Sequence, residues 1–208
     1  MGKIRNIVFD NGGVISIADM ENARRIFLDL GVSNIDDFIN ITTQKGIFGD
    51  LEAGRLTGEE FCEALSKEAG KPISLEEGAR GMRGFVPSVP PRNLEKVRAL
   101  KEEGYRIYML SNTNPFVGAF MRSESYDGHG HSLEWYMDKL YLSYEMKVMK
   151  PDERIFRMMV ADSGMVPEET LFVDDSPVNI RTAEQIGFRT FCPANGSDWT
   201  IEIDECLR

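Results

Sequence analysis

The chain has 208 residues, of which 42% are hydrophobic and 28% are charged, and its net charge is -10. It is longer than one typical domain of roughly 150 residues and shorter than two, so we expect one domain with an insertion, or two small domains. The net negative charge repels nucleic acid and anionic membranes at long range, so neither is expected as a partner.

Short apolar runs typical of buried strands lie towards both ends of the chain. In chain order they are Ile4–Phe9, Arg106–Leu110, Lys139–Leu142, Thr170–Val173 and Arg189–Phe191. Helical patterns of crossover length separate them, which favours parallel pairing. The sequence therefore predicts an α/β fold with a Rossmann-like, mostly parallel sheet and helices on both faces.

The region from about residue 19 to residue 100 has the pattern of helices instead. Asp19 is a candidate N-cap, and Thr57 and Ser74 each begin a capping-box pattern. The helix after Ser74 would contain three glycines, each less favourable than alanine by about 1 kcal/mol, which opposes a helix there.

The boundaries of this helical region follow from composition. The proline-rich stretch Val86–Pro91 cannot continue a helix, and a second hinge is expected near Ile15–Ala18. We therefore predict an all-α helical-bundle cap at 18–87, inserted after the first strand of a core domain that comprises 1–17 and 88–208.

Three further patterns in the sequence narrow the class of protein that it can encode. The apolar runs are too short for a signal-peptide core or a membrane span, so we expect a cytoplasmic protein without a membrane partner. The three cysteines are widely spaced and lie in no CxxC pattern, so neither a disulfide framework nor a zinc site is expected. His129 and His131 are spaced to serve one ion, but their glycine-rich surroundings favour a surface loop. The oligomeric state stays open.

Polar clusters follow four of the apolar runs. They are Asp10 to Gly13, Ser111 to Asn114, Lys150 with Pro151, and Asp174 to Pro177. Each cluster alone could be an ordinary turn or a helix cap. Ligands of an open parallel sheet bind outside the carboxyl ends of its strands, and four clusters at four such ends indicate one shared site.

These residue types suit phosphoryl transfer. The Asp10 carboxylate can attack phosphorus if the negative charges of nucleophile and phosphate are screened. Mg²⁺ prefers oxygen ligands and would be held by Asp10 and by Asp174 or Asp175, while Lys150 would supply a fixed cation. Asp10 is thus the candidate catalytic residue, and Mg²⁺ is the expected cofactor.

The phosphate is expected to contact the polar residues after the first two strands. Ser111 and the main-chain NH groups that follow it, beginning with Asn112, can donate hydrogen bonds to phosphate oxygens. Gly12 and Gly13 let the backbone turn sharply and approach the phosphate. The expected partner is a small phosphorylated metabolite.

These residues resemble the four motifs of the haloacid dehalogenase-like hydrolase superfamily, in order and spacing, over nearly the whole chain. The matching segments are Ile7–Val14, Leu110–Asn114, Lys150–Pro151 and Leu171–Ala183. The resemblance implies a magnesium-dependent phosphatase that forms an aspartyl-phosphate on Asp10. It further implies that Asp175 is the direct metal ligand, that Asp174 supports it, and that Gly12 binds the metal through its main-chain oxygen.

The cap carries a second resemblance. The segment Glu52–Phe61 is similar to the cap of the bacterial α-D-glucose-1-phosphate phosphatase group of this superfamily. That similarity implies a small helical cap and a sugar phosphate as the substrate.

Gly12 departs from the superfamily pattern, in which an Asp at this position protonates the leaving group and then activates water. General acid–base catalysis is typically worth about 10²–10⁴-fold, and glycine cannot supply it. Glu52 and Arg55 of the cap are candidate substitutes, although a solvated helix face is the other interpretation of both.

Two alternatives to the phosphatase follow. One is a catalytically impaired member of the superfamily that binds a phosphorylated ligand, which Gly12 favours. The other is a haloacid dehalogenase, which Asp174 and Asp175 oppose, because the fourth motif of those enzymes resembles a Ser-Asn stretch instead.

Overall fold

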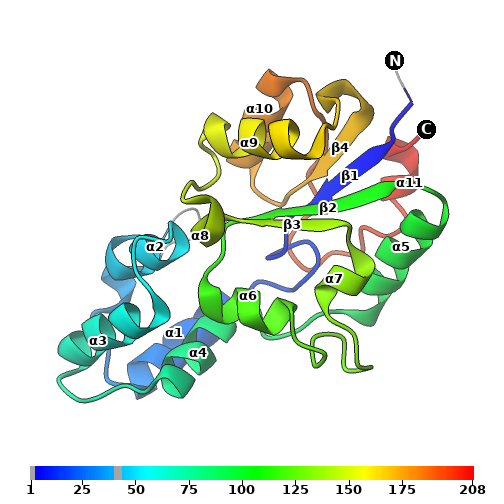
Figure 1. The fold of residues 1–208 in the computed structure, drawn as a ribbon. Coiled ribbons are helices and arrows are strands. Elements are labelled where there is room, and N and C mark those ends of the chain that lie inside the picture. The colour runs from blue at the N-terminus through cyan, green and yellow to red at the C-terminus, as the bar shows by residue number, and fades with distance from the viewer. Residues whose placement is uncertain (1–2, 40–43) are drawn as a thin grey trace.

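A single five-stranded sheet organises the protein in the computed structural model, which describes residues 3–39 and 44–208. The strands are β1 (Asn6–Phe9), β2 (Arg106–Ser111), β3 (Lys139–Leu142), β4 (Thr170–Val173) and β5 (Arg189–Phe191). All four pairings are parallel, and the order is β3-β2-β1-β4-β5 (Figure 1). The first strand is thus the central one, and chain order reverses beside it, where an α/β sheet binds its ligands.

The predicted strands are all present, with small shifts at two boundaries. β1 begins at Asn6 rather than Ile4, and β2 continues through Ser111. Phe9 of β1 pairs with Met109 on one side and Val173 on the other, so these strands end close together. The strands read as continuous apolar runs because both faces of a parallel sheet are buried.

Helices cover both faces of the sheet, as predicted (Figure 1). The helices of the core are α5 (Pro91–Glu102), α6 (Pro115–Met121), α7 (Leu133–Tyr136), α8 (Ser143–Met146), α9 (Glu153–Ser163), α10 (Pro177–Ile186) and α11 (Ile203–Cys206). Val8 packs with Phe156 and Phe172 on the α9 and α10 side. Its neighbours Ile7 and Phe9 belong to the cluster on the α5 side, so successive side chains of β1 face opposite layers.

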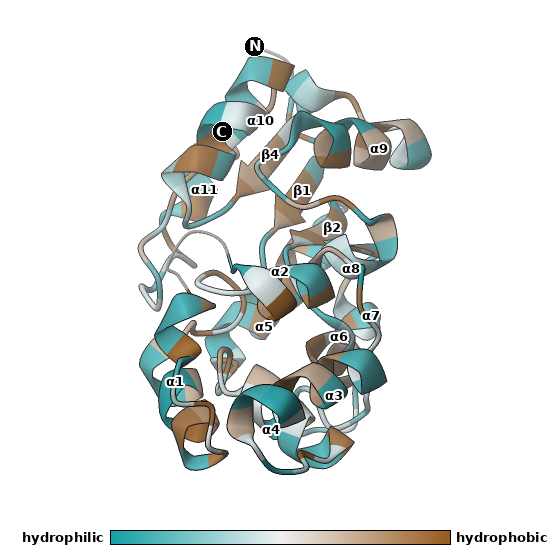
Figure 2. Ribbon diagram, turned by 90° about the vertical axis from the view of Figure 1, so that its left-hand side faces the viewer, coloured by the Kyte–Doolittle hydropathy of each residue, from teal (hydrophilic) through white to brown (hydrophobic). Residues whose placement is uncertain are grey.

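The cap region (18–87) lies to one side of the sheet in Figures 1 and 2. Its helices are α1 (Met20–Asp29), the 3-10 turn Ile35–Asp37, α2 (Gly46–Glu52), α3 (Gly58–Ala69) and α4 (Leu75–Arg83). Asp19 accepts a hydrogen bond from the Asn22 NH at 2.8 Å, and Thr57 and Ser74 each form a capping box. The three predicted helix starts are confirmed.

Close packing explains why α4 is a helix despite its glycines. A Cβ at Gly78 would lie 2.5 Å from the Cys62 Sγ, and one at Gly81 would lie 2.5 Å from the Phe27 Cζ. Such distances are far shorter than van der Waals contact, so larger residues would force α4 away from α1 and α3. The low helix propensity of glycine is therefore offset by closer burial against neighbouring helices.

The chain enters and leaves the cap at adjacent points. The Ile17 NH donates to the Ser88 carbonyl at 2.9 Å, and the Asp19 NH donates to the Phe85 carbonyl at 2.8 Å. The two predicted hinges therefore lie side by side. The division into a core of 1–17 and 88–208 and a cap of 18–87 stays a prediction.

The hydropathy of the residues matches the arrangement of the sheet between its covering helices. Figure 2 shows β1 and β4 as hydrophobic strands between helices of mixed character. No helix within residues 3–39 and 44–208 combines the length and hydropathy needed to cross a membrane.

The two histidines lie in a loop, as expected. His131 stacks on Trp135 with ring centroids 4.3 Å apart, and its Nδ1 lies 2.8 Å from the Asp127 carboxylate. The exposed His129 donates its main-chain NH to the same carboxylate at 2.7 Å. Asp127 thus organises this loop through hydrogen bonds.

Candidate active site

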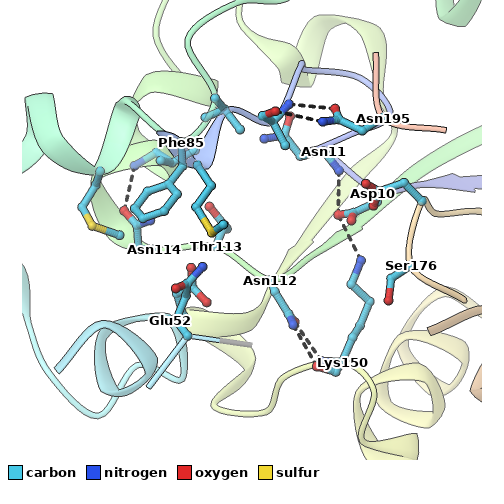
Figure 3. A pocket seen from close by; sticks show the side chains of 18 of the residues that line it. Asp10, Asn11, Glu52, Phe85, Asn112, Thr113, Asn114, Lys150, Ser176 and Asn195 are labelled. Carbon is cyan, nitrogen blue, oxygen red and sulfur yellow. Dashed lines mark hydrogen bonds and ion pairs between the residues drawn. The ribbon is translucent and has the colours of Figure 1, made fainter. Parts of the chain in front are cut away.

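A pocket of about 440 Å³ opens at the carboxyl ends of β1, β2 and β4 (Figure 3). Asp10 and Lys150 lie on the core side of this pocket, and Glu52 and Phe85 lie on the cap side. The other lining residues of the cap region are Ala18, Met20, Gln44, Met82 and Val86. The pocket therefore combines the polar strand ends predicted to form a site with a partly apolar wall from the cap.

Three carboxylates meet on the core side. Ligand atoms of Asp10, Asp174 and Asp175 all lie within 4.8 Å of one another. Asp174 is fully buried and accepts hydrogen bonds from the Ser176 NH at 2.9 Å and from the Asn179 Nδ2 at 3.0 Å. Asp175 lines the pocket, whereas Asp174 does not. The division between Asp175 as direct metal ligand and Asp174 as supporting carboxylate stays a prediction.

The cluster fits a small divalent cation by its chemistry. Three oxygen-bearing acidic side chains within reach of one point repel one another unless a cation or hydrogen-bond donors compensate them. Mg²⁺ takes carboxylate oxygens, keeps several waters, and completes its coordination with substrate phosphate oxygens. The residues present therefore suit magnesium.

Lys150 is the fixed cation of the site. Its side chain is 1% exposed, and its Nζ lies 3.0 Å from the Asp10 carboxylate and 2.7 Å from that of Asp174. The same Nζ donates to the Leu110 carbonyl at 2.7 Å. Burial alone would lower the pKa of Lys150, but Asp10 and Asp174 outweigh it and raise that pKa above its ordinary value. Lys150 stays charged and neutralises part of the acidic cluster.

Burial and mutual repulsion also raise the pKa values of two of the acids. Burial raises the pKa of Asp10 to about 7, with Lys150 opposing the shift and the other two aspartates adding to it. Burial, followed by the charge of Asp174, raises the pKa of Asp175 to about 6. A bound cation would favour the ionised forms of both side chains.

The two glycines after Asp10 have different surroundings. Gly13 adopts a φ of +82°, and a Cβ there would lie 2.1 Å from the Asp175 Oδ2. Gly12 is less crowded, because a Cβ would meet only the Val86 Cγ1 at 3.8 Å and the Ala18 Cβ at 3.9 Å. Only glycine allows Asp175 its position beside residue 13, whereas a Cβ at position 12 would make only ordinary van der Waals contacts.

The predicted phosphate contacts after β2 differ in detail from the structure. Ser111 is 2% exposed, does not line the pocket, and directs its Oγ to the Asn112 carbonyl at 3.4 Å. Asn112 lines the pocket, but its side chain accepts from the Lys150 NH at 2.7 Å and donates to the Lys150 carbonyl at 2.8 Å. Asn112 therefore holds the lysine in place, and phosphate binding by Ser111, Asn112 and Gly13 stays a prediction.

The two cap residues considered as substitutes for the missing acid, Glu52 and Arg55, lie in different surroundings. Arg55 is 63% exposed, forms an ion pair with Asp50 at 2.7 Å, and does not line the pocket. Glu52, at the end of α2, lines the pocket. Burial, and then the charge of Asp10, raises the pKa of Glu52 to about 8. A solvated helix face thus describes Arg55 but not Glu52.

Ser143 also contributes to the site, although it belongs to none of the four polar clusters predicted to form it. Ser143 is fully buried, accepts a hydrogen bond from the Thr113 NH at 2.9 Å, and donates one to the Glu52 carbonyl at 2.7 Å. It joins the loop after β2 to the cap. It follows the third strand directly, so the rule used for the other strand ends could have found it.

Comparison with known proteins places this geometry in a family. Residues 85–187 match the model for haloacid dehalogenase-like hydrolases. D-ribitol-5-phosphate phosphatase of Bacteroides thetaiotaomicron is 42% identical over 204 residues, which cover 98% of each chain. The chain belongs to the haloacid dehalogenase-like hydrolase family.

Solved structures of this family agree over nearly the full length. A haloacid dehalogenase-like hydrolase from Porphyromonas gingivalis is 42% identical and has a TM-score of 0.94, with 100% of this chain and 99% of that one covered. A family enzyme from B. thetaiotaomicron, solved with magnesium and inorganic phosphate, is 33% identical and has a TM-score of 0.86, with 96% and 98% covered.

These comparisons confirm three predictions: the superfamily, the parallel α/β core and the hydrolase class. The magnesium prediction agrees with the solved complex and with the three-carboxylate cluster. The narrower resemblance to α-D-glucose-1-phosphate phosphatases stays a prediction.

Proposed function

We propose that this hydrolase is a magnesium-dependent phosphatase that acts on a small sugar or polyol phosphate through an aspartyl-phosphate on Asp10. The observation that carries the proposal is the meeting of Asp10, Asp174, Asp175 and Lys150 at one end of the pocket. A relative that shares 42% of its residues with this chain is a phosphatase of a five-carbon polyol phosphate, which supports the substrate class.

The residues divide the chemistry among them. The Asp10 oxygen attacks phosphorus, the bond to the leaving oxygen breaks, and a water molecule later releases the phosphate from Asp10. Asp10, Asp175 and the Gly12 carbonyl would hold Mg²⁺, which would screen the negative charges of nucleophile and phosphate from each other. Lys150 holds the Asp10 carboxylate at 3.0 Å and Asp174 at 2.7 Å, so the nucleophile keeps a fixed direction.

The pocket suits a small, partly polar substrate. A cavity of about 440 Å³ accommodates a phosphorylated metabolite rather than a macromolecule. Asn11, Asn114 and Asn195 line it beside the apolar side chains of Met20 and Phe85. The side-chain NH₂ groups of Asn11 and Asn114 can donate to hydroxyl groups, whereas the Asn195 amide is already paired with the Ala18 backbone. The apolar wall can exclude water from the reacting phosphate.

A screen of phosphorylated metabolites, with and without Mg²⁺, tests the proposal. We expect Mg²⁺-dependent release of phosphate, highest for five- and six-carbon sugar and polyol phosphates, and loss of that activity in Asp10→Asn. Asp29→Asn, the same change at an exposed position of α1, is the matched control and should retain activity. Wild-type activity in Asp10→Asn would refute the assigned nucleophile.

The second candidate function is a catalytically impaired protein that binds a phosphorylated ligand. Gly12 favours it, because this position carries no proton-transferring side chain. Calorimetric binding of inorganic phosphate in the presence of Mg²⁺, together with no turnover of any substrate, would support this function instead.

A further inference from the structure

The pocket contains a carboxyl group that the proposed chemistry does not yet use. Four described residues with ionisable side chains line the pocket: Asp10, Glu52, Lys150 and Asp175. Three of them already have proposed roles: Asp10 as the nucleophile, Lys150 as the fixed cation and Asp175 as a metal ligand. Glu52 is the remaining one, and it faces the site from the cap (Figure 3).

Glu52 is held against the core by its own backbone. Its carbonyl accepts from the Ser143 Oγ at 2.7 Å, and two residues later the Gly54 carbonyl accepts from the Lys147 Nζ at 2.7 Å. A Cβ at Gly54 would lie 2.1 Å from the Tyr144 carbonyl, so the turn after α2 packs directly on α8. The backbone that carries Glu52 is thus held by three contacts with one core segment, residues 143–147.

The surroundings of Glu52 suit a proton donor. Among residues 3–39 and 44–208, the Glu52 side chain has no hydrogen bond or ion pair, and burial and the charge of Asp10 are what act on its carboxyl. Burial near Asp10 disfavours the charged form and keeps the carboxyl protonated at neutral pH. At position 12, where the family carries an acid, this chain has a glycine and therefore no side chain that could transfer a proton.

We propose that Glu52 is the general acid and base of this phosphatase, supplied by the cap in place of the side chain that Gly12 lacks. This inference rests on the function proposed above. When the Asp10 oxygen bonds to phosphorus, the bond from phosphorus to the leaving oxygen breaks, and that oxygen takes the proton of Glu52 to leave as an alcohol.

The second half of the reaction returns the proton. The Glu52 carboxylate takes a proton from water as the water oxygen bonds to phosphorus. The bond from Asp10 to phosphorus then breaks, which releases inorganic phosphate and restores the Asp10 carboxylate and the protonated Glu52. One carboxyl group thereby serves both steps, with no net gain or loss of protons on the enzyme.

The test compares leaving groups. An alkoxide leaving group needs a proton, whereas p-nitrophenolate leaves without one. The decrease in kcat/KM caused by Glu52→Gln should therefore depend on the substrate. We expect kcat/KM for ribitol 5-phosphate to fall by about 10²–10⁴-fold and that for p-nitrophenyl phosphate to fall by less than about tenfold. Glu63→Gln, on the exposed face of α3, is the matched control and should change neither.

A rescue experiment separates catalysis from structure. Gly12 lines the pocket, and a Cβ there would make only ordinary van der Waals contacts, so Gly12→Asp in the Glu52→Gln background should restore most of the activity on ribitol 5-phosphate. Equal losses on both substrates without rescue would show that Glu52 only shapes the pocket, and an unchanged Glu52→Gln would show that another group transfers the proton. Either result overturns the inference while Asp10-dependent turnover stands. A wild-type protein that hydrolyses neither substrate would overturn the proposed function and this inference with it.

Discussion

Gly13→Ala tests whether the site depends on the close approach of residue 13 to Asp175. The new Cβ would lie 2.1 Å from the Asp175 Oδ2 and 2.4 Å from its Cγ, distances that real Cβ atoms do not show. The carboxylate must therefore move by about 1 Å, and a misplacement of that size can cost about 100-fold in rate. Alanine at a φ of +82° adds backbone strain of about 1–2 kcal/mol.

A matched variant separates the two effects. Gly104 has a φ of +96°, and no atom lies within 4 Å of the point that a Cβ there would occupy, so Gly104→Ala imposes strain without a collision. Urea unfolding should show similar losses of stability in both variants. Steady-state kinetics with p-nitrophenyl phosphate and Mg²⁺ should show the loss of about 100-fold for Gly13→Ala alone. Equal activity of the two variants would refute the assigned role of this contact.

Two further predictions concern charge in the site. Lys150→Met leaves the buried carboxylates of Asp10 and Asp174 without their cation and should lower the free energy of unfolding by about 3–5 kcal/mol in urea, whereas the exposed Lys139→Met should cost far less. Mg²⁺ affinity measured by calorimetry should fall as the pH is lowered: because the pKa values of Asp10 and Asp175 are raised to about 7 and about 6, protons compete with the metal below these values. Affinity that is unchanged between about pH 8 and about pH 5 would contradict this linkage.

The sequence predicted the core well because its elements have local signals. Each strand was a short apolar run, and Thr57 and Ser74 stand at helix starts that their own side chains cap. The parallel sheet then placed Asp10 beside Asp174 and Asp175, since strand ends meet at one edge. The apolar runs, together with the rule that parallel strand ends meet at one edge of a sheet, were sufficient to predict the cluster of aspartates.

The remainder of the site depends on contacts that leave no local pattern. Nothing in the sequence separates Glu52 from Arg55, because the choice depends on how α2 docks on α8. Similarly, the amide of Asn112 could have faced a phosphate or the lysine backbone, and only the structure shows the second. The glycines of α4 opposed a helix by propensity alone, and the packing of Gly81 on Phe27 explains them.

The central claim is that Asp10 carries the phosphoryl group during turnover. Rapid acid quench of the wild-type protein with Mg²⁺ and ribitol 5-phosphate, followed by peptide mass spectrometry, tests it most directly. We predict phosphate on the peptide that contains Asp10, removed by hydroxylamine as an acyl phosphate is, and absent in Asp10→Asn. Rapid turnover without covalent phosphate on that peptide would contradict the account.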